Sequence, residues 1–254
     1  MEEVTGSSPV STTTIFVNWL RRSIVALDLN SAELREIASH YEAPRETWVR
    51  ANMVISQDGH FVGPNNTSRD LTGPADLKLL LLLRALSDVI LVGANTARQE
   101  NYRQPKLRPD FDFLGKNIPR LAVVSESLKF DLTTGLFSGG SERTIIINIG
   151  STEPSPELTR IAQVVSIDNN LDLGAAIISE LTHLGMNAVT CEGGTTLLTS
   201  LLQADAIDEY DLTTSPVRVG SIAKPSQALP HGWDLMSTAV ADDYKFQRFF
   251  NKRD

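Results

Sequence analysis

Cysteine is almost absent from this chain of 254 residues, since Cys191 is the only one. A single cysteine excludes an internal disulfide and a zinc site built from several thiolates. The four histidines are scattered along the sequence without the short spacings typical of metal ligands. We therefore expect no dedicated metal site.

Long apolar runs and an excess of positive charge are also missing. No stretch approaches the roughly 18 apolar residues of a spanning helix, because the apolar run Leu79–Leu83 ends at Arg84. The start of the chain, with Glu2 and Glu3, lacks the basic residues of a secretory signal. The net charge of −8 argues against a nucleic-acid-binding surface, and an anionic ligand would need local cations or backbone N–H groups. We expect a cytoplasmic protein that binds neither membranes nor nucleic acids.

The remaining composition, with 41% hydrophobic and 21% charged residues, is ordinary for a globular protein with a core. Residues 1–46 are rich in Ser, Thr and Glu and show only a weak helical pattern near Ala32–Ala38. We interpret them as an N-terminal extension that packs on the domain or on a partner subunit. Residues 47–254 contain neither a repeat nor a linker, which predicts one domain.

Within this domain, strand-like and helix-like segments alternate. The continuous apolar run at 88–93 is typical of a strand buried on both faces. We expect further strands at 48–55, 121–124, 144–149, 164–167, 187–191, 207–217 and 242–250, helices at 74–86, 173–184 and 195–202, and turn-rich connections at 126–143 and 150–160. This order predicts an α/β fold with a mostly parallel central sheet, helices on both faces and an antiparallel C-terminal edge.

Two strand-to-helix junctions have the chemistry of phosphate-binding loops. Gly93 ends one expected strand, and Thr96 lies in the first turn after it. Gly193 and Gly194 separate another strand from another helix. Glycines let the backbone approach a pyrophosphate, and the N–H groups at a helix start favour anions. Either junction alone is a common turn, and neither matches the GxGxxG fingerprint or the ATPase P-loop.

Three other groups of polar residues allow two interpretations each. Glu192 would repel a pyrophosphate, so it either ties down backbone N–H groups or faces a reaction centre. Asp58, followed by Gly59, is by itself typical of a turn. Arg98, Arg103 and Arg108 belong either to a solvated loop or to a site for a phosphate.

Four motifs taken together resemble a known family. In chain order they are Ser56-Gln-Asp-Gly59, Ser68-Arg-Asp-Leu-Thr-Gly-Pro74, Leu83–Arg98, and Glu192–Leu198 with Asp208-Glu209 and Ser215–Gly220. Over about residues 48–220 the chain resembles the reductase domain of riboflavin-biosynthesis enzymes, the 5-amino-6-(5-phosphoribosylamino)uracil reductases. It is most similar to their stand-alone branch, the pyrimidine reductases. The resemblance implies a dihydrofolate-reductase-like fold.

The same resemblance implies NADPH as the cofactor and assigns residues to it. Its phosphates would be held by Gly93, Thr96, Gly193, Gly194 and Thr195, and Thr196 and Leu197 would also bind the cofactor. Ser125 would approach the ribose 2′-phosphate, and Val54 would face the nicotinamide. Asp58 would be a catalytic proton donor with a pKa raised by burial, and Glu192 would be a catalytic residue between nicotinamide and substrate. The implied substrate-binding residues are Asn52, Ser68, Thr72, Arg98 and Arg103.

The implied reaction is hydride transfer from NADPH to C1′ of a pyrimidine ribosyl phosphate, which converts the ribosyl chain to ribityl. The substrate would be 5-amino-6-(5-phosphoribosylamino)uracil or its undeaminated equivalent. The sequence departs from the family in having Asn52 at a position where many relatives carry lysine, in lacking the fused zinc deaminase domain, and in offering no arginine beside Ser125. Two alternatives stay open, a reductase of dihydrofolate or another pterin and a non-catalytic nucleotide-binding protein. Because the family is often dimeric, we expect a homodimer.

Overall fold

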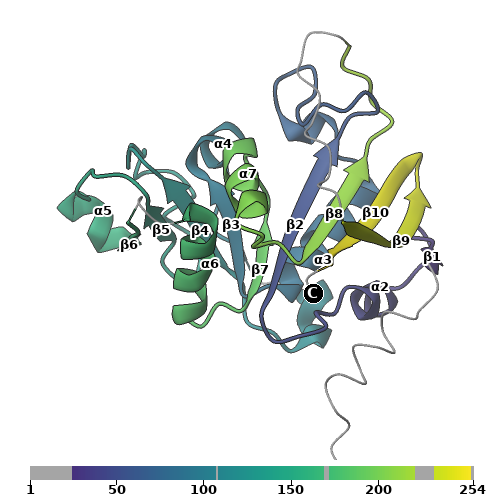
Figure 1. The fold of residues 1–254 in the computed structure, drawn as a ribbon, viewed down its shortest axis with the longest axis horizontal. Helices are drawn as coiled ribbons and strands as arrows, with labels where there is room; N and C mark the ends of the chain where they lie inside the picture. The colour runs from purple at the N-terminus through teal and green to yellow at the C-terminus, as the bar shows by residue number, and fades with distance from the viewer. Residues whose placement is uncertain (1–24, 107, 169–171, 221–231, 253–254) are drawn as a thin grey trace, which may run out of the picture.

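The central feature of the computed structural model is one large sheet (Figure 1). The structure describes residues 25–106, 108–168, 172–220 and 232–252. In these ranges ten strands follow the order β1-β9-β10-β8-β2-β7-β3-β4-β5-β6. The strands are β1 (Val25–Leu27), β2 (Trp48–Ile55), β3 (Val89–Gly93), β4 (Arg120–Ser125), β5 (Ile145–Asn148), β6 (Gln163–Ser166), β7 (Ala188–Cys191), β8 (Glu209–Thr214), β9 (Trp233–Ala241) and β10 (Tyr244–Asn251).

Parallel pairing dominates this sheet. Strand β10 is antiparallel to both of its neighbours, β8 and β9, whereas the other strand pairs among the described residues are parallel. The predicted mostly parallel sheet with an antiparallel C-terminal edge is therefore confirmed.

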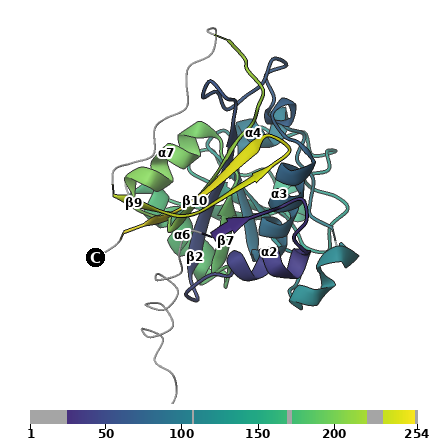
Figure 2. The ribbon, with the colours of Figure 1, turned by 90° about the vertical axis from the view of Figure 1, so that its right-hand side faces the viewer.

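Helices cover both faces of the sheet, as predicted. The helices are α2 (Leu34–His40), α3 (Pro74–Leu86), α4 (Ala94–Gln99), α5 (Pro156–Ile161), α6 (Leu173–His183) and α7 (Thr195–Gln203), with short 3₁₀ turns at Ser68–Asp70 and Pro109–Leu114. Figure 2 shows α6 and α7 on one side of the strands and α2 and α3 on the other. Alternate residues of β3 illustrate the division, because Leu91 packs in the core under α6 and α7 while Ile90 packs in the core under α4 and α5.

Helix α3 positions much of the site, and its sequence explains its limits. Pro74 occupies the first helical position after Gly73, where the missing N–H of proline costs nothing. Leu79, Leu82 and Leu83 form a buried stripe at helical spacing. The side of the helix away from this stripe lines the site described below.

The structure corrects three expectations about secondary structure. Residues 150–160 are not turns throughout, because α5 starts at Pro156, where the Ser155 hydroxyl accepts a hydrogen bond from the N–H of Leu158. Strand β8 ends at Thr214 rather than at 217. Strand β9 has no counterpart in the prediction, because its half-buried mixture of polar and apolar residues gives a weak signal before β10 and β1 pair with it.

The described part of the N-terminal extension, residues 25–46, packs on the domain. Strand β1 pairs with β9, and Ile37 of α2 belongs to the same core cluster as α3. The buried guanidinium of Arg50 donates to the carbonyl of Tyr41 at 2.8 Å and pairs with Glu209 at 3.0 Å. Burial opposes the charge on Glu209, but Arg248 and Arg50 outweigh it and lower the pKa of Glu209 to about 2. Residues 1–24 lie outside the described residues.

No helix within the described ranges has both the length and the apolar character needed to cross a bilayer.

The core face of α3 provides a test of the fold. Leu83 is 0% exposed, whereas Leu77, on the same helix, is 46% exposed. We expect Leu83→Ala to lower the free energy of unfolding by about 2–5 kcal/mol, because it leaves a cavity in the core. Leu77→Ala should change it by less than about 0.5 kcal/mol. Urea unfolding followed by circular dichroism measures both, and equal losses would show that the burial pattern of α3 is wrong.

Candidate active site

The two predicted phosphate-binding junctions meet at the carboxyl ends of adjacent strands. Strand β7 lies between β2 and β3, so the residues after β7 and β3 emerge side by side. The N–H of Gly93 donates to the carbonyl oxygen of Gly193 at 2.9 Å. A Cβ atom on Gly194 would lie 2.6 Å from Oγ1 of Thr96. The two junctions that the sequence singles out thus lie together at one edge of the sheet.

Glycine is required at both positions of the second junction. Gly193 has a φ of +89°, which residues with a side chain rarely adopt. Gly194 has no room for a side chain beside Thr96. A concave strip of bare backbone therefore leads into helix α7.

Helix α7 begins directly after this strip. Its first intrahelical bond runs from the N–H of Leu198 to the carbonyl of Gly194, so the N–H groups of Thr195, Thr196 and Leu197 precede the hydrogen-bond ladder. Thr195 and Thr196 are exposed, but the side chain of Leu197 is buried in the core. Only the backbone of Leu197 can serve the predicted cofactor site.

A small cavity of about 230 Å³ opens beside these junctions, on the α3 face of β2. Asn52 and Val54 alternate with Ala51 and Met53, which pack in the core on the opposite face. The cavity brings together nine predicted site residues: Asn52, Val54, Ser68, Thr72, Thr96, Glu192, Gly193, Gly194 and Thr195.

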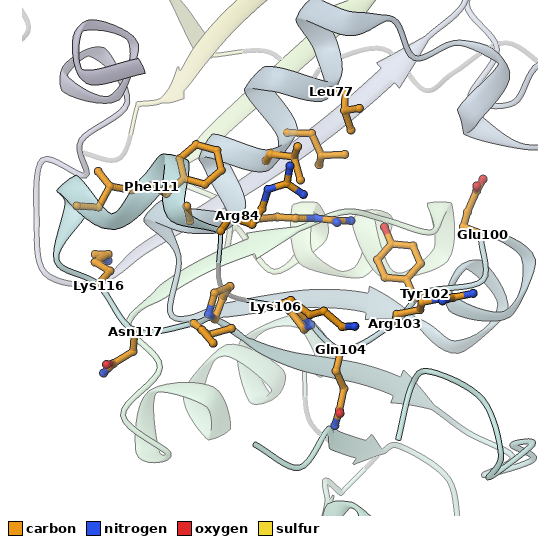
Figure 3. Close-up of a pocket in the computed structure, with 18 of the residues that line it drawn as sticks. Leu77, Arg84, Glu100, Tyr102, Arg103, Gln104, Lys106, Phe111, Lys116 and Asn117 are labelled. Atoms are coloured by element: carbon orange, nitrogen blue, oxygen red, sulfur yellow. The ribbon is translucent and has the colours of Figure 1, made fainter. Parts of the chain in front are cut away.

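A larger cavity of about 870 Å³ adjoins the small one, and Ser68, Thr72 and Tyr102 belong to the lining of both. It runs between α3 and the loop after α4 (Figure 3). The cations lining it are Arg69, Arg84, Arg103, Lys106, Arg108 and Lys116. Its acidic lining residues are Glu100 and Asp112, whereas the described lining of the small cavity contains no lysine or arginine. Arg103, for which the resemblance implies contact with the substrate, thus lines a cavity suited to an anion.

Glu192 lies at the boundary of the two cavities and is held by side chains rather than by backbone N–H groups. Nε and Nη2 of Arg84 donate to its two carboxylate oxygens at 2.6 Å each, and the Tyr102 hydroxyl donates at 2.6 Å. Burial disfavours the charge on Arg84, but the Glu192 carboxylate outweighs it and raises the pKa of Arg84 above its ordinary value. Burial, reinforced by Glu192, raises the pKa of Tyr102. The arrangement fixes Glu192 as part of the cavity wall.

Asp76 is a site residue that the sequence did not reveal. It lines the small cavity from the first turn of α3 and is only 5% exposed. Burial raises the pKa of its carboxyl group above the ordinary value, and the nearby hydroxyls of Thr213 and Thr72 oppose this rise only in part. In the sequence, an acidic residue just after Pro74 is what any helix start would show, so no signal distinguished it.

Asp58 does not have the environment predicted for a proton donor. The hydroxyl of Ser56 and the N–H of Gly220 donate to its carboxylate at 2.6 and 2.7 Å. These bonds hold the pKa of Asp58 well below its ordinary value, so the expected rise is wrong. Asp58 belongs to neither cavity lining and instead fixes the loop after β8 against the loop after β2.

Arg98 is likewise outside both cavities, so its predicted contact with the substrate is not supported. Its guanidinium donates to the carbonyl of Lys129 at 3.1 Å and lies over the ring of Phe130 at 5.9 Å. It faces the loop after β4, which begins at Ser125. The Ser125 hydroxyl accepts from the N–H of Leu128 at 3.1 Å, which shapes the same loop.

No group of three His, Cys, Asp or Glu residues in the described ranges is placed to hold a metal ion.

Comparison with characterised proteins gives related sequences and folds. The chain is 25% identical over 185 residues to the 2,5-diamino-6-ribosylamino-4(3H)-pyrimidinone 5′-phosphate reductase of Archaeoglobus fulgidus, covering 70% of this chain and 84% of that protein. It is 22% identical over 213 residues to the reductase of the same name from Methanothermobacter thermautotrophicus, covering 78% and 91%.

Solved structures agree on the fold. A pyrimidine reductase-like protein from Corynebacterium diphtheriae superimposes with a TM-score of 0.75 at 22% identity, covering 88% of this chain and all of that one. The riboflavin biosynthesis reductase Rib7 of Saccharomyces cerevisiae superimposes with a TM-score of 0.61 at 15% identity, covering 86% and 99%. The model of the RibD C-terminal domain matches residues 47–236. The paired glycine junctions, the adjoining cavities and this match together show that the chain belongs to the RibD C-terminal domain family.

Proposed function

We propose that this protein is a reductase of riboflavin biosynthesis that uses NADPH to convert the ribosyl chain of a pyrimidine ribosyl phosphate to ribityl. The observation that carries the proposal is the meeting of the two glycine junctions at the mouth of a cavity that leads into a second, cation-rich one. The name shared by the two archaeal relatives supports the substrate class.

The glycine junctions fit a dinucleotide. A pyrophosphate requires close approach to bare backbone and N–H groups aimed at its oxygens. Gly193 and Gly194 supply the bare backbone, and the start of α7 at Thr195 supplies the N–H groups. Thr96, across the junction, adds a hydroxyl that lines the cavity. When bound, the nicotinamide supplies a hydride.

The adenosine end of the cofactor would lie toward β4, whose carboxyl end carries Ser125. The sequence has no arginine directly after Ser125, but Arg98 contacts the same loop from α4. A guanidinium there suits the 2′-phosphate that distinguishes NADPH from NADH. This placement supports NADPH and gives Arg98 a cofactor role in place of the predicted substrate role.

The division of charge orients the substrate. A phosphate is best stabilised in the larger cavity (Figure 3). The loop opposite α3 contributes Arg103, Lys106 and Arg108 to the lining of this cavity. The pyrimidine ring, with its N–H and carbonyl groups, would then lie toward the small cavity, whose described lining combines polar groups with apolar side chains such as Val54 and Phe61 and lacks cations. The reacting C1′ falls between them, near Glu192 and the glycine junctions.

The residues around this point bind, orient and exclude water. The ion pair of Glu192 with Arg84 fixes two charges before any ligand arrives, so neither side chain needs to reorganise during the reaction. Val54 contributes an apolar surface beside the junctions. Asn52, in place of the common lysine, offers a neutral amide that donates and accepts hydrogen bonds but supplies no charge. A homodimer and a cytoplasmic location remain predictions.

The direct test mixes the purified protein with NADPH and the 5′-phosphate of either 2,5-diamino-6-ribosylamino-4(3H)-pyrimidinone or 5-amino-6-ribosylaminouracil. We expect loss of the reduced nicotinamide absorbance and a product that has gained one hydride and one proton by mass. Dihydrofolate serves as the comparison substrate. Turnover of dihydrofolate alone would overturn the proposal, as would tight NADPH binding without turnover of any of the three.

Adding one methyl group at Gly194 tests the role of the glycine junction in cofactor binding. Gly194→Ala places a Cβ against the Thr96 hydroxyl and should separate the two junctions. We expect the Kd for NADPH to rise by about tenfold or more, since about 1.4 kcal/mol of lost interaction suffices. Fluorescence titration of NADPH measures it, with Gly115→Ala as the control, because a Cβ there meets nothing within 4 Å although its φ is +61°. Unchanged affinity in Gly194→Ala would place the cofactor elsewhere.

Arg98 provides a test of cofactor choice. We expect Arg98→Gln to raise the KM for NADPH about tenfold while leaving that for NADH nearly unchanged, because only NADPH carries the 2′-phosphate. Steady-state kinetics with both cofactors gives the ratio. An equal rise for both cofactors would assign Arg98 a purely structural role in the 125–130 loop.

A further inference from the structure

One buried carboxyl group of the small cavity, that of Asp76, forms no ion pair with a cation in the described part of the chain. Of the three acidic residues in its lining, Glu192 is bound by Arg84 and Tyr102. Glu100 accepts from the hydroxyl of Thr67 at 2.6 Å and lies 3.6 Å from Nε of Arg69. Asp76 differs from both, because in the described part of the chain it pairs with no cation and the polar side chains that act on its carboxyl group are the hydroxyls of Thr213 and Thr72.

Burial makes this arrangement costly unless the carboxylate gains partners when a ligand binds. An ionised carboxylate accepts up to four hydrogen bonds, and the neighbouring hydroxyls of Thr213 and Thr72 leave capacity for more. A structural role at the start of α3 requires neither burial nor contact with a cavity, since an exposed aspartate interacts equally well with the helix dipole. The position of Asp76 in the cavity wall therefore points to a ligand with N–H donors.

The site's geometry places Asp76 beside the region assigned to the pyrimidine ring. Thr213 of β8 is in register with Val54 of β2, and Val54 and Asn52 line the same cavity. Thr72 and Asp76 approach it from the start of α3. The carboxyl group thus lies on the α3 side of β2 and β8, in the cavity whose described lining contains no lysine or arginine.

The two candidate substrates differ at the edge that a carboxylate would recognise. In a 2-amino-4(3H)-pyrimidinone, the C2 amino group and N3–H are adjacent donors, which match the two oxygens of one carboxylate. In the corresponding uracil, C2 carries a carbonyl oxygen, which would face a carboxylate oxygen without a proton between them. A buried carboxylate left in that contact is strongly unfavourable.

Building on the proposed function, we propose that Asp76 is a specificity-determining residue that accepts hydrogen bonds from N3–H and the C2 amino group of the pyrimidine. The protein then prefers the undeaminated 2,5-diaminopyrimidinone to the deaminated uracil compound.

Asp76→Asn gives the sharpest test, because the carboxamide has the same shape but presents one acceptor and one donor. That pair matches N3–H and the C2 carbonyl of the uracil compound. We expect wild type to favour the 2-amino substrate, and the ratio of kcat/KM for the 2-amino over the 2-oxo substrate to fall in Asp76→Asn by on the order of 100-fold. The control is Asp112→Asn, which removes an exposed carboxylate lining the larger cavity and should leave the ratio unchanged.

A binding measurement separates this inference from the reductase proposal. Calorimetric titration with 2,5,6-triamino-4(3H)-pyrimidinone and with 5,6-diaminouracil reports on the ring alone, without turnover. The same fall in the preference for the 2-amino ring over the 2-oxo ring in Asp76→Asn would support the assignment even if neither ribosyl phosphate is reduced. Equal loss for both rings and both substrates in Asp76→Asn, with the preference of wild type retained, would overturn it and leave Asp76 a structural residue of α3. A wild-type preference for the 2-oxo compounds would overturn it as well.

Discussion

The parallel pairing of β2, β7 and β3 is the constraint on which the rest of this molecule depends. Parallel strands end at the same edge of a sheet, so the residues after each of the three emerge together. The hydrogen bond from Gly93 to Gly193 closes the gap between two of these ends. The site proposed for the cofactor pyrophosphate depends on that contact, because it brings bare backbone and a helix start to one space.

Charge is distributed unevenly around this edge, although the whole chain is acidic, with a net charge of −8. The larger cavity is lined by six cationic side chains, which come from the 3₁₀ turn at Ser68–Asp70, from α3 and from the 100–119 segment. The smaller cavity has carboxyl groups and hydroxyls. The Arg84–Glu192 ion pair lies where the two cavities meet, and its opposite charges compensate each other there. Such a separation can orient a ligand that is anionic at one end and rich in N–H donors at the other.

Two aspartates show how environment decides the role of a carboxyl group. Asp58 accepts bonds from Ser56, Val219 and Gly220, which stabilise its charged form and lower its pKa. Asp76 is buried beside the cavity, which raises its pKa despite two hydroxyl partners. The first is suited to fixing a loop, and the second to meeting a ligand. The same side chain serves opposite purposes because desolvation and hydrogen bonding act on its charge in opposite directions.

The sequence by itself determined the sheet's character, the helices α3, α6 and α7, and both glycine junctions, because apolar periodicity and glycine placement act locally. It also identified Glu192, Asn52 and Thr72 as cavity residues through family resemblance. Only the tertiary structure shows that Arg98 contacts the loop after β4, that Asp58 is bound to the loop after β8, and that Asp76 lines the small cavity. Those outcomes depend on which side chains from distant strands and helices face one another, and a linear pattern carries no information about the desolvation or the partners that such packing creates.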